Sequence, residues 1–401
     1  MRKYFNTEGI CYPDEHYMVN IADRLEEIMK YIAARKYFVI NRARQYGKTT
    51  TLSLLAKKLK GEYIVFPLSF EGIGDSAYID EYSFCRMIYR LFYDAIYYGE
   101  AEQIPDSIRD HCKAMSLETA KTDFSDLSEF ISTLSSTLTK PVIMIIDEVD
   151  QASNHDVFLA FLGLLRAKYL KRRSRPTFHS CILAGVYDIK NLKSRIREDA
   201  DHQYNSPWNV AAKFEVDMSF SAKDIEQMLT EYESDCNTGM NTSEIATMIH
   251  DYTSGYPFLV SRICKVVDEE LHNWTLNGIR EAIKCLLAES NTLFDDMRKK
   301  ISDFPELRQM LYAILFTGKS FPFNLDNFCI NMASMFGFIK EENGMVVIAN
   351  RIFETRLYNL FMSEEMLNSA ISALSETNHQ RHRQLLYRSP NQRPTPDRCD
   401  H

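Results

Sequence analysis

The first half of the chain alternates short apolar runs rich in β-branched residues with longer stretches in which apolar residues recur every three or four positions. The short runs predict buried strands and the longer stretches predict amphipathic helices. The predicted strands span residues 37–40, 62–70, 142–146, 181–186 and 214–218. The predicted helices span residues 22–34, 50–60, 82–97, 124–138 and 157–169. Strands that alternate with helices predict an α/β fold, in which a doubly wound parallel sheet carries helices on both faces.

The pattern changes after residue 218. From residue 221 to about 300 the periodicity is helical throughout, with Ser221-Ala222-Lys223-Asp224 and Thr242-Ser243-Glu244 as candidate helix N-caps. A helix-like stretch at 306–316 follows, and Asn343-Gly344 then separates two apolar runs, which is the strongest short signal for a β-hairpin. Helices followed by one hairpin predict a winged-helix-like domain.

These changes divide the chain into four predicted parts. Residues 1–218 form the sheet domain, 219–302 a helical lid domain and 303–362 the winged-helix-like domain. Residues 363–401 form a short helix and a polar tail. From about residue 377 the tail is rich in Gln, Arg, Pro and His and has few apolar residues, so we expect it to be disordered.

Composition and charge restrict the possible partners. The 401 residues are 45% hydrophobic and 25% charged, which is the balance of a globular protein and not of a fibre or a disordered chain. Lys and Arg number 47 against 55 Asp and Glu, and the net charge is −8. Because no positive field covers the whole molecule, nucleic acid would have to bind at a local basic patch.

The cysteines and the N-terminus indicate the compartment. The nine cysteines are scattered without a C-x-x-C pair, so we expect reduced thiols and neither a disulfide framework nor a zinc cluster. The N-terminus has no apolar signal segment, and the longest aliphatic run, 142–146, is too short to cross a membrane. We therefore expect a cytoplasmic protein without membrane contact.

The stretch after the first predicted strand has the character of a phosphate-binding loop. It reads Val39-Ile40-Asn41-Arg42-Ala43-Arg44-Gln45-Tyr46-Gly47-Lys48-Thr49-Thr50 and leads into a predicted helix. In a P-loop, backbone N–H groups and the helix N-terminus surround the β-phosphate, a lysine neutralises the β- and γ-phosphates, and the next hydroxyl binds Mg²⁺. Gly47, Lys48 and Thr49 fit these roles.

This motif is incomplete, because Arg42 stands where the full pattern has its first glycine. Taken alone, Gly47-Lys48-Thr49 also fits a capped helix that follows a buried strand. Arginine is compatible with the loop if its backbone stays in a conformation open to residues with a β-carbon. A second motif is needed to favour one interpretation.

That second motif is an apolar run that ends in carboxylates, Pro141-Val142-Ile143-Met144-Ile145-Ile146-Asp147-Glu148-Val149-Asp150. A strand buried on both faces is apolar throughout, and its carboxyl end is where a parallel sheet presents ligands. We expect Asp147 to hold Mg²⁺ through water and Glu148 to orient and polarise the attacking water. The alternative is a solvated acidic turn. The four letters from Asp147 to Asp150 also match a protease cleavage site, but we expect them to be buried.

Four stretches resemble one protein family, the bacterial AAA-ATPase-like proteins, which belong with the STAND and archaeal-ATPase types of P-loop NTPase. They are Phe5-Asn6-Thr7-Glu8-Gly9 with Tyr12-Pro13 and His16-Tyr17-Met18, the loop at 42–50, Ala184-Gly185-Val186-Tyr187-Asp188, and Ser206-Pro207-Trp208-Asn209 through 214–218. The resemblance spans about residues 1–360. It implies a P-loop ATPase core at 1–218 that binds ATP and Mg²⁺. In this family the loop lacks the first glycine, so Arg42 matches the family pattern.

The resemblance also implies roles for residues outside the two motifs. Thr253-Ser254-Gly255-Tyr256-Pro257-Phe258-Leu259 is similar to the G-x-P motif of the STAND lid, which implies that Pro257 and its neighbours close over the nucleotide. A proline-initiated helix in an ordinary bundle is the alternative. The N-terminal loop implies a base pocket with Tyr17 or Tyr12 against adenine, and Tyr187 and Asp188 lie where sensor 1 is expected.

The full set of residues expected to bind the nucleotide is Arg44, Gln45, Tyr46, Gly47, Lys48, Thr49, Thr50, Tyr17 and Pro257, with Thr49 and Asp147 on the metal and with Glu148 and Lys48 as catalytic residues. Longer family members often continue into a nuclease-like domain. The resemblance fades near Met362, so we expect this chain to lack that domain.

Basic clusters leave several alternatives open. The run from Lys168 to Arg175 is either a solvated loop or a contact for nucleic acid or a neighbouring subunit. Arg195 and Arg197 are candidates for an arginine finger. The winged-helix-like domain has few basic residues between 325 and 338, so a protein-interaction or domain-packing role is favoured over DNA binding.

The function that this sequence predicts best is a cytoplasmic Mg-ATP-binding ATPase that uses ATP binding and hydrolysis as a conformational switch. The alternatives are a nucleotide-gated scaffold with little turnover and a DNA-associated ATPase. Besides the nucleotide, we expect a protein partner or self-association.

Overall fold

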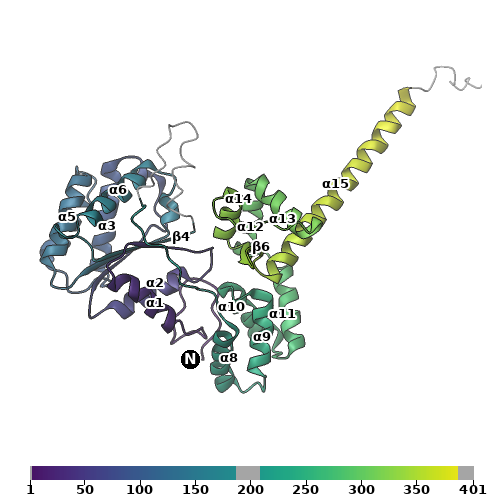
Figure 1. Ribbon diagram of the computed structural model, residues 1–401, viewed down its shortest axis with the longest axis horizontal. Coiled ribbons are helices and arrows are strands. Elements are labelled where there is room, and N and C mark those ends of the chain that lie inside the picture. Colours follow the sequence, from purple (N-terminus) through teal and green to yellow (C-terminus); the bar gives the residue numbers. More distant parts are fainter. Residues whose placement is uncertain (1, 187–207, 387–401) are drawn as a thin grey trace, which may run out of the picture.

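The computed structural model describes residues 2–186 and 208–386, and it begins with a parallel α/β unit (Figure 1). The sheet is four-stranded, in the order β1 (Phe38–Asn41), β4 (Ser180–Gly185), β3 (Val142–Asp147) and β2 (Ile64–Ser69). All neighbouring strands run parallel. Four of the five predicted strands are therefore confirmed, and so is the doubly wound fold class.

The predicted strand at 214–218 is wrong. This segment has no regular secondary structure, and the pairing nearby is one parallel bridge between Phe38 and Ala212 beside β1. A side chain takes one of the acceptors that a ladder would use, since the Val216 carbonyl accepts a hydrogen bond from Arg42 Nη2 at 2.7 Å. The apolar alternation at 214–218 instead reflects burial of Phe214, Val216 and Met218 against the sheet.

Alternating side chains of the strands cover two separate cores. Phe38 and Ile40 pack with α1 (Ala22–Ala33) and α2 (Lys48–Leu59), whereas Val39 belongs to the opposite face. The opposite face is covered by α3 (Glu81–Tyr97), α4 (Asp106–Met115), α5 (Phe124–Thr137) and α6 (Asp156–Leu170), with short 3-10 turns at Asp75–Tyr78 and Val149–Ala152. The sequence patterns predicted all of these α-helices except α4.

A helical unit follows the sheet. It contains α8 (Ala222–Cys236), α9 (Thr242–Thr253), α10 (Pro257–Val266), a π-helical turn at Val267–Leu271, and α11 (Leu276–Ala288). The predicted cap at Ser221 is confirmed as a capping box with Asp224. For α9 the predicted cap is one residue late, because the side chain of Asn241 accepts the hydrogen bond from the Glu244 backbone.

The C-terminal unit combines helices with a hairpin. It contains α12 (Thr292–Asp303), α13 (Pro305–Thr317), α14 (Phe328–Met335), β5 (Ile339–Glu342), β6 (Met345–Ile348) and α15 (Arg351–Leu386). The predicted hairpin is confirmed, with Asn343 and Gly344 at φ values of 53° and 78° in the turn. The division into domains stays a prediction.

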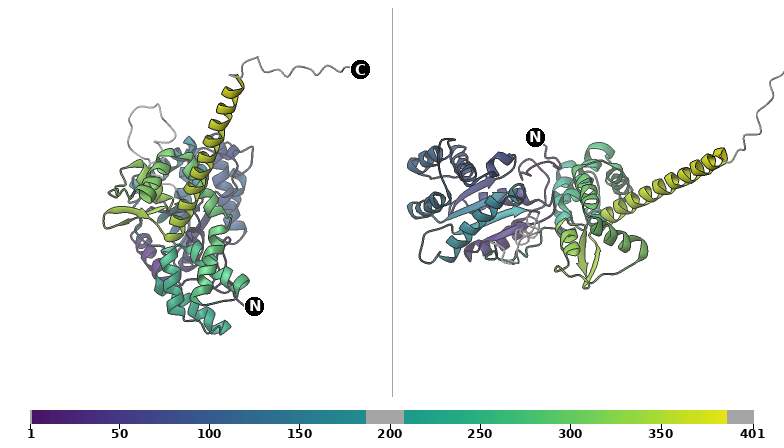
Figure 2. Two further views of the ribbon diagram at one scale, coloured as in Figure 1. Left: turned by 90° about the vertical axis from the view of Figure 1, so that its right-hand side faces the viewer. Right: turned by 90° about the horizontal axis from the view of Figure 1, so that it is seen from above.

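Helix α15 differs from its predicted short length. Its first turns are buried through Ile352, Phe353, Leu357 and Phe361, and the helix then leaves the body (Figure 2). Residues 377–386, expected to be disordered, continue this helix. Residues 387–401 of the predicted tail lie outside the described residues.

The three units share a continuous core. The cluster on the α1 and α2 face of the sheet extends through α8–α11 into α12–α15. Arg24 of α1 adds polar contacts, since its guanidinium bonds the Ser219 carbonyl at 2.6 Å and the Asp224 carboxylate at 2.7 Å. Within the described part of the chain, no helix combines the length and apolar character that a membrane crossing requires.

Candidate functional site

The predicted phosphate-binding loop lies between β1 and α2 and turns at Gly47, directly before the helix. Gly47 is the N-cap of α2 with a φ of 77°, and its carbonyl accepts hydrogen bonds from the backbone and hydroxyl of Thr51. Lys48 is buried, and its amine donates to the carbonyls of Arg42 at 3.1 Å and Ala43 at 3.0 Å. Burial lowers the pKa of Lys48, while the nearby carboxylates of Asp150, Glu148 and Asp147 oppose that shift.

Arg42 fits the loop without the missing glycine. Its backbone φ is outside the positive region, so a β-carbon causes no strain there. Its side chain points to the edge of the sheet, where the guanidinium lies 5.2 Å from the centre of the Phe214 ring and donates to the carbonyls of Asn41 and Val216. The arginine therefore anchors the start of the loop to segment 214–218.

The end of β3 brings carboxylates to this loop. The Thr49 hydroxyl donates to Asp147 Oδ2 at 2.7 Å, which joins the two predicted metal ligands directly. Glu148 follows in a left-handed conformation with a φ of 53°. Burial raises the pKa of Glu148, and Lys48 opposes that shift. A raised pKa makes the carboxylate a better proton acceptor.

Asp150 is a residue that sequence reasoning missed. Its Oδ2 accepts a hydrogen bond from the Val186 backbone at 2.6 Å, directly after β4. A Cβ at Gly185 would lie 2.8 Å from Asp150 Oδ1, so the end of β4 packs tightly against this side chain. Asp150 thus connects the chain after β3 to the end of β4, and its place in the acidic run from Asp147 to Asp150 is the sequence signal that could have identified it.

The helical unit reaches the loop through the residue before the predicted one. Pro257 is buried at the first position of α10, whereas Tyr256 donates its hydroxyl hydrogen bond to the Arg44 carbonyl. The rings of Tyr256 and Tyr46 lie 4.7 Å apart, edge to face. Pro257 fixes where α10 begins, and the contact itself comes from Tyr256.

The structure does not bring Tyr17 to the loop. Its side chain is 1% exposed and packs between Phe5 and Tyr232, with its hydroxyl donating to Asp235. No ring face is free for adenine, so the expectation for Tyr17 is wrong. The alternative residue, Tyr12, is 45% exposed and follows Cys11, whose backbone N–H donates to the Thr50 hydroxyl at 3.1 Å.

The remaining loop residues face the C-terminal unit. Arg44 forms an ion pair with Asp296 at 3.6 Å, and Gln45 Nε2 donates to the Thr292 hydroxyl at 3.0 Å. Both partners lie on α12. The sequence motif gave no sign of these contacts.

Two other groups of predicted residues have different outcomes. Tyr187, Asp188, Arg195 and Arg197 lie outside the described residues. The basic run is partly structural, because Lys168 donates to the Ser128 carbonyl and the Ser132 hydroxyl of α5. Arg172 covers the ring of Tyr169 at 3.8 Å. Lys168 is therefore not part of a solvated loop.

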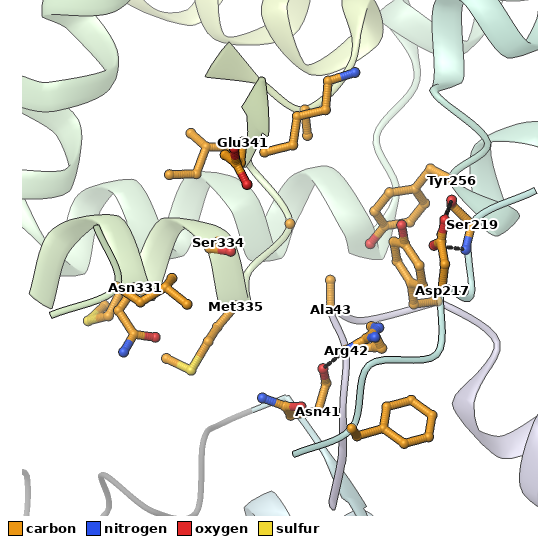
Figure 3. Close-up of a pocket in the computed structure, with 18 of the residues that line it drawn as sticks. Asn41, Arg42, Ala43, Asp217, Ser219, Tyr256, Asn331, Ser334, Met335 and Glu341 are labelled. Carbon is orange, nitrogen blue, oxygen red and sulfur yellow. Dashed lines mark hydrogen bonds between the residues drawn. The ribbon is translucent and has the colours of Figure 1, made fainter. Parts of the chain in front are cut away.

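A cavity of about 1130 Å³ lies on the outer side of the loop (Figure 3). Asn41, Arg42 and Ala43 form one wall, Asp217, Ser219 and Tyr256 a second, and Asn331, Ser334, Met335 and Glu341 a third. Lys48, Thr49 and Asp147 do not line it. The residues predicted to bind phosphate and metal are therefore not part of its lining, and the cavity lies among the loop, α14 and the hairpin.

The donor set at the loop fits magnesium. A threonine hydroxyl and a carboxylate are hard oxygen ligands, and Mg²⁺ usually binds through one or two protein ligands while it keeps several waters. In the described ranges no cluster of three or more His, Cys, Asp or Glu side chains is arranged to hold a metal by itself. Thr49 and Asp147 are therefore ligands of the kind that Mg²⁺ takes in proteins.

The model of the AAA-like domain family matches residues 25–363. This chain belongs to the AAA-like domain family. The matched region of this AAA-like protein includes the loop, the acidic end of β3, the helical unit and the C-terminal unit as far as the first turns of α15. No curated protein matches its sequence.

Several solved structures are similar to this AAA-like protein to different degrees. A Walker-type ATPase of Pyrococcus abyssi is similar with a TM-score of 0.61 and 14% identity over 88% of this chain and 99% of that chain. The ORC2 protein of Aeropyrum pernix, in ADPNP–ADP complexes, has a TM-score of 0.49 and 12% identity over 88% of this chain and 98% of that chain. The RuvB Holliday junction branch migration motor of Thermotoga maritima has a TM-score of 0.39 and 11% identity over 82% of this chain and 92% of that chain. The first of these similarities shows the P-loop NTPase fold.

Proposed function

We propose that this AAA-like protein binds Mg-ATP at the loop and hydrolyses it. The observation that carries the proposal is the 2.7 Å hydrogen bond between the Thr49 hydroxyl and Asp147, beside the buried amine of Lys48. Phosphoryl transfer depends on positioning and on charge neutralisation, and these residues supply both. A bound Mg²⁺, held by Thr49 and Asp147, would neutralise charge on the β- and γ-phosphates.

The residues at and around the loop have proposed roles in this reaction. Lys48 neutralises phosphate charge, and Glu148 accepts a proton from the attacking water and orients it. The backbone from Arg44 to Thr50, with the N-terminus of α2, surrounds the phosphates. Exposed Tyr12 is the proposed contact for the base, supported by the bond between Cys11 and Thr50.

The proposed switch is a movement of the helical unit relative to the sheet. Tyr256 touches the loop at the Arg44 carbonyl, so a change in the loop reaches α10 directly. Pro257 begins α10 immediately after this contact and transmits the change to a rigid helix. Binding and hydrolysis would thus alter the position of the helical unit.

Two substitutions at the loop test this function. Lys48→Ala is expected to abolish ATP binding, because the charge that neutralises the phosphates is lost. Glu148→Gln is expected to keep ATP bound and to lower kcat by roughly 10²-fold or more, as for loss of a general base. Equilibrium binding of ATP and steady-state phosphate release measure the two effects.

Lys57→Ala is the matched control, since Lys57 is an exposed lysine on the same helix. It should bind and hydrolyse ATP like the wild-type chain. Wild-type ATP affinity in Lys48→Ala would contradict the proposed site. Binding without measurable turnover in the wild-type chain would instead favour a nucleotide-gated scaffold.

The C-terminal unit is proposed to be winged-helix-like and to contact protein. The supporting observation is α14, Phe328–Met335, which contains no charged residue and leaves Phe328 exposed. DNA-binding helices usually carry basic residues. Hydrolysis that is stimulated by DNA at low salt, and that loses this stimulation as salt rises, would favour a DNA-associated ATPase instead.

A further inference from the structure

Four consecutive residues of the phosphate loop, 43–46, contact the C-terminal half of the chain. A Cβ at Gly337 would lie 3.0 Å from the Ala43 Cβ, so the chain before β5 packs directly on the loop. Loop residues 44–46 also contact Tyr256, Asp296 and Thr292. Three of these four contact residues lie on α12 or beyond it.

Arg44 carries the charge in this arrangement. Its Nη1 lies 3.6 Å from Asp296 Oδ1, with the arginine side chain 61% exposed and the aspartate 18% exposed. Arg44 belongs to the same loop as Lys48, four residues before it, so this ion pair connects α12 to the loop proposed to meet phosphate.

Gln45 is held in an unfavourable conformation. Its φ of 55° is in the left-handed region, which residues with a β-carbon rarely adopt. Its buried Oε1 and the Nδ2 of nearby Asn291 have no hydrogen-bond partner among the described residues. A buried amide group without a partner destabilises an arrangement relative to one in which it is bonded. The contact between the loop and α12 is thus poised to rearrange.

We propose that the loop and α12 form a clasp that nucleotide phosphates open, with Asp296 as a positioning residue that competes with phosphate for Arg44. The clasp is defined by Arg44 and Gln45 of the loop and by Thr292 and Asp296 of α12. This inference rests on the proposed function. Phosphate oxygens bind guanidinium groups strongly and with defined geometry, so bound ATP draws Arg44 from Asp296.

The consequence reaches the whole C-terminal unit. Helix α12 ends at Asp303 and α13 begins at Pro305, so a shift of α12 moves the helix that follows. By linkage, the factor by which the clasp weakens nucleotide binding equals the factor by which nucleotide weakens the clasp. The clasp therefore lowers the affinity of the loop for nucleotide, and nucleotide binding in turn changes the position of the C-terminal unit.

Asp296→Asn in the full chain tests the clasp. The substitution keeps the shape of the side chain and removes its charge. Binding of the fluorescent analogue mant-ATP with Mg²⁺ is expected to become about two- to fivefold tighter, the range that a partly exposed ion pair supports. A role in packing alone would lower stability and leave the affinity unchanged or weaker.

Asp295→Asn is the matched control, because Asp295 is the neighbouring carboxylate on α12 and pairs with Arg298 of the same helix. It should leave the mant-ATP affinity unchanged. Asp296→Glu, which restores the charge, should return the affinity towards the wild-type value. In an Arg44→Gln chain, Asp296→Asn should have no further effect, since the cation it competes for is gone.

Hydrogen exchange of α12 amides gives a second readout. In the wild-type chain exchange at 292–303 should increase when the non-hydrolysable analogue ADPNP is added, and in Asp296→Asn it should be increased before nucleotide is added. If Asp296→Asn does not fold, Thr292→Val applies the same test and keeps the carboxylate. Binding by the wild-type chain without tighter binding in these variants overturns the clasp alone, whereas no binding by the wild-type chain overturns the proposed function as well.

Discussion

Gly255 lies between α9 and α10 and contacts the segment that leads from the sheet to the helical unit. Its φ is 71°, and its carbonyl accepts a hydrogen bond from the Phe220 backbone at 2.8 Å. A Cβ at this position would lie 1.9 Å from the Phe220 carbonyl oxygen. Both the backbone conformation and the close approach therefore require glycine directly before Tyr256.

Gly255→Ala is expected to lower the free energy of unfolding by about 2–5 kcal/mol, because a left-handed alanine is strained and the added methyl displaces backbone. Chemical denaturation of the full chain measures the loss. Gly239→Ala is the control, since Gly239 has a φ of 75° with no atom within 4 Å of the added Cβ. It should lose only about 1 kcal/mol from backbone strain, and equal losses would show that the contact with Phe220 is unimportant.

At the scale of elements, the start of α8 combines a helix cap with a contact to α1. The Asp224 carboxylate completes the capping box with Ser221 and accepts a hydrogen bond from Arg24 at 2.7 Å. Burial alone would raise the pKa of Asp224, but hydrogen bonds from Arg24 and Ser221 outweigh it and lower the pKa. One carboxylate thus fixes both where α8 begins and how it meets α1.

Asp224→Asn is expected to cost about 1 kcal/mol of unfolding free energy at neutral pH, through the weakened cap and the lost ion pair. The folded pKa lies below the unfolded value of about 3.9, so this stabilisation is present above about pH 4 and is lost as pH falls through the folded pKa. Denaturant unfolding measured from pH 7 to pH 3 should show the two chains converging at the acid end.

Glu226→Gln provides the comparison on the same helix, since Glu226 has no part in the cap. Its unfolding free energy should follow that of the wild-type chain across the whole pH range. A constant difference between Asp224→Asn and wild type at every pH would contradict the assigned role of the carboxylate.

At the scale of the whole molecule, the N-terminal segment, residues 2–17, ties the sheet unit to the helical unit. Arg2 pairs with Asp268 at 2.7 Å, and Phe5 is buried among Tyr17, Tyr232 and Trp274. In its middle, the Cys11 backbone bonds Thr50 at the first turn of α2. The segment therefore links the helical unit to the loop from a second side.

Phe5→Ala is expected to reduce the unfolding free energy by about 3–5 kcal/mol, the usual effect of removing a fully buried phenylalanine. It should also weaken ATP binding, because the segment that presents Tyr12 loses its anchor. Thermal unfolding and equilibrium ATP binding measure the two effects. Tyr4→Ala is the control, because Tyr4 is a half-exposed neighbour of similar size, and it should change both quantities by less. An unchanged ATP affinity in Phe5→Ala would contradict the proposed contact between Tyr12 and the base.

The sequence by itself determined the features that depend on neighbouring residues. The alternation of apolar runs fixed four strands, and Asn343-Gly344 fixed the hairpin, because turn geometry and helix periodicity are local properties. The motif positions of Thr49 and Asp147 also predicted their meeting, since the ends of parallel strands share one edge of the sheet.

Only the tertiary structure decided which side chains are free to act. Tyr17 and Tyr12 look alike in sequence, yet one is enclosed by Tyr232 and the other is exposed. Arg42 bonds Val216, and Gln45 bonds Thr292, across 174 and 247 residues of sequence. Such partners carry no local signal, because burial and long-range hydrogen bonds depend on how whole units pack. For that reason the sequence predicted a phosphate loop, and only the tertiary structure showed that α12 contacts this loop.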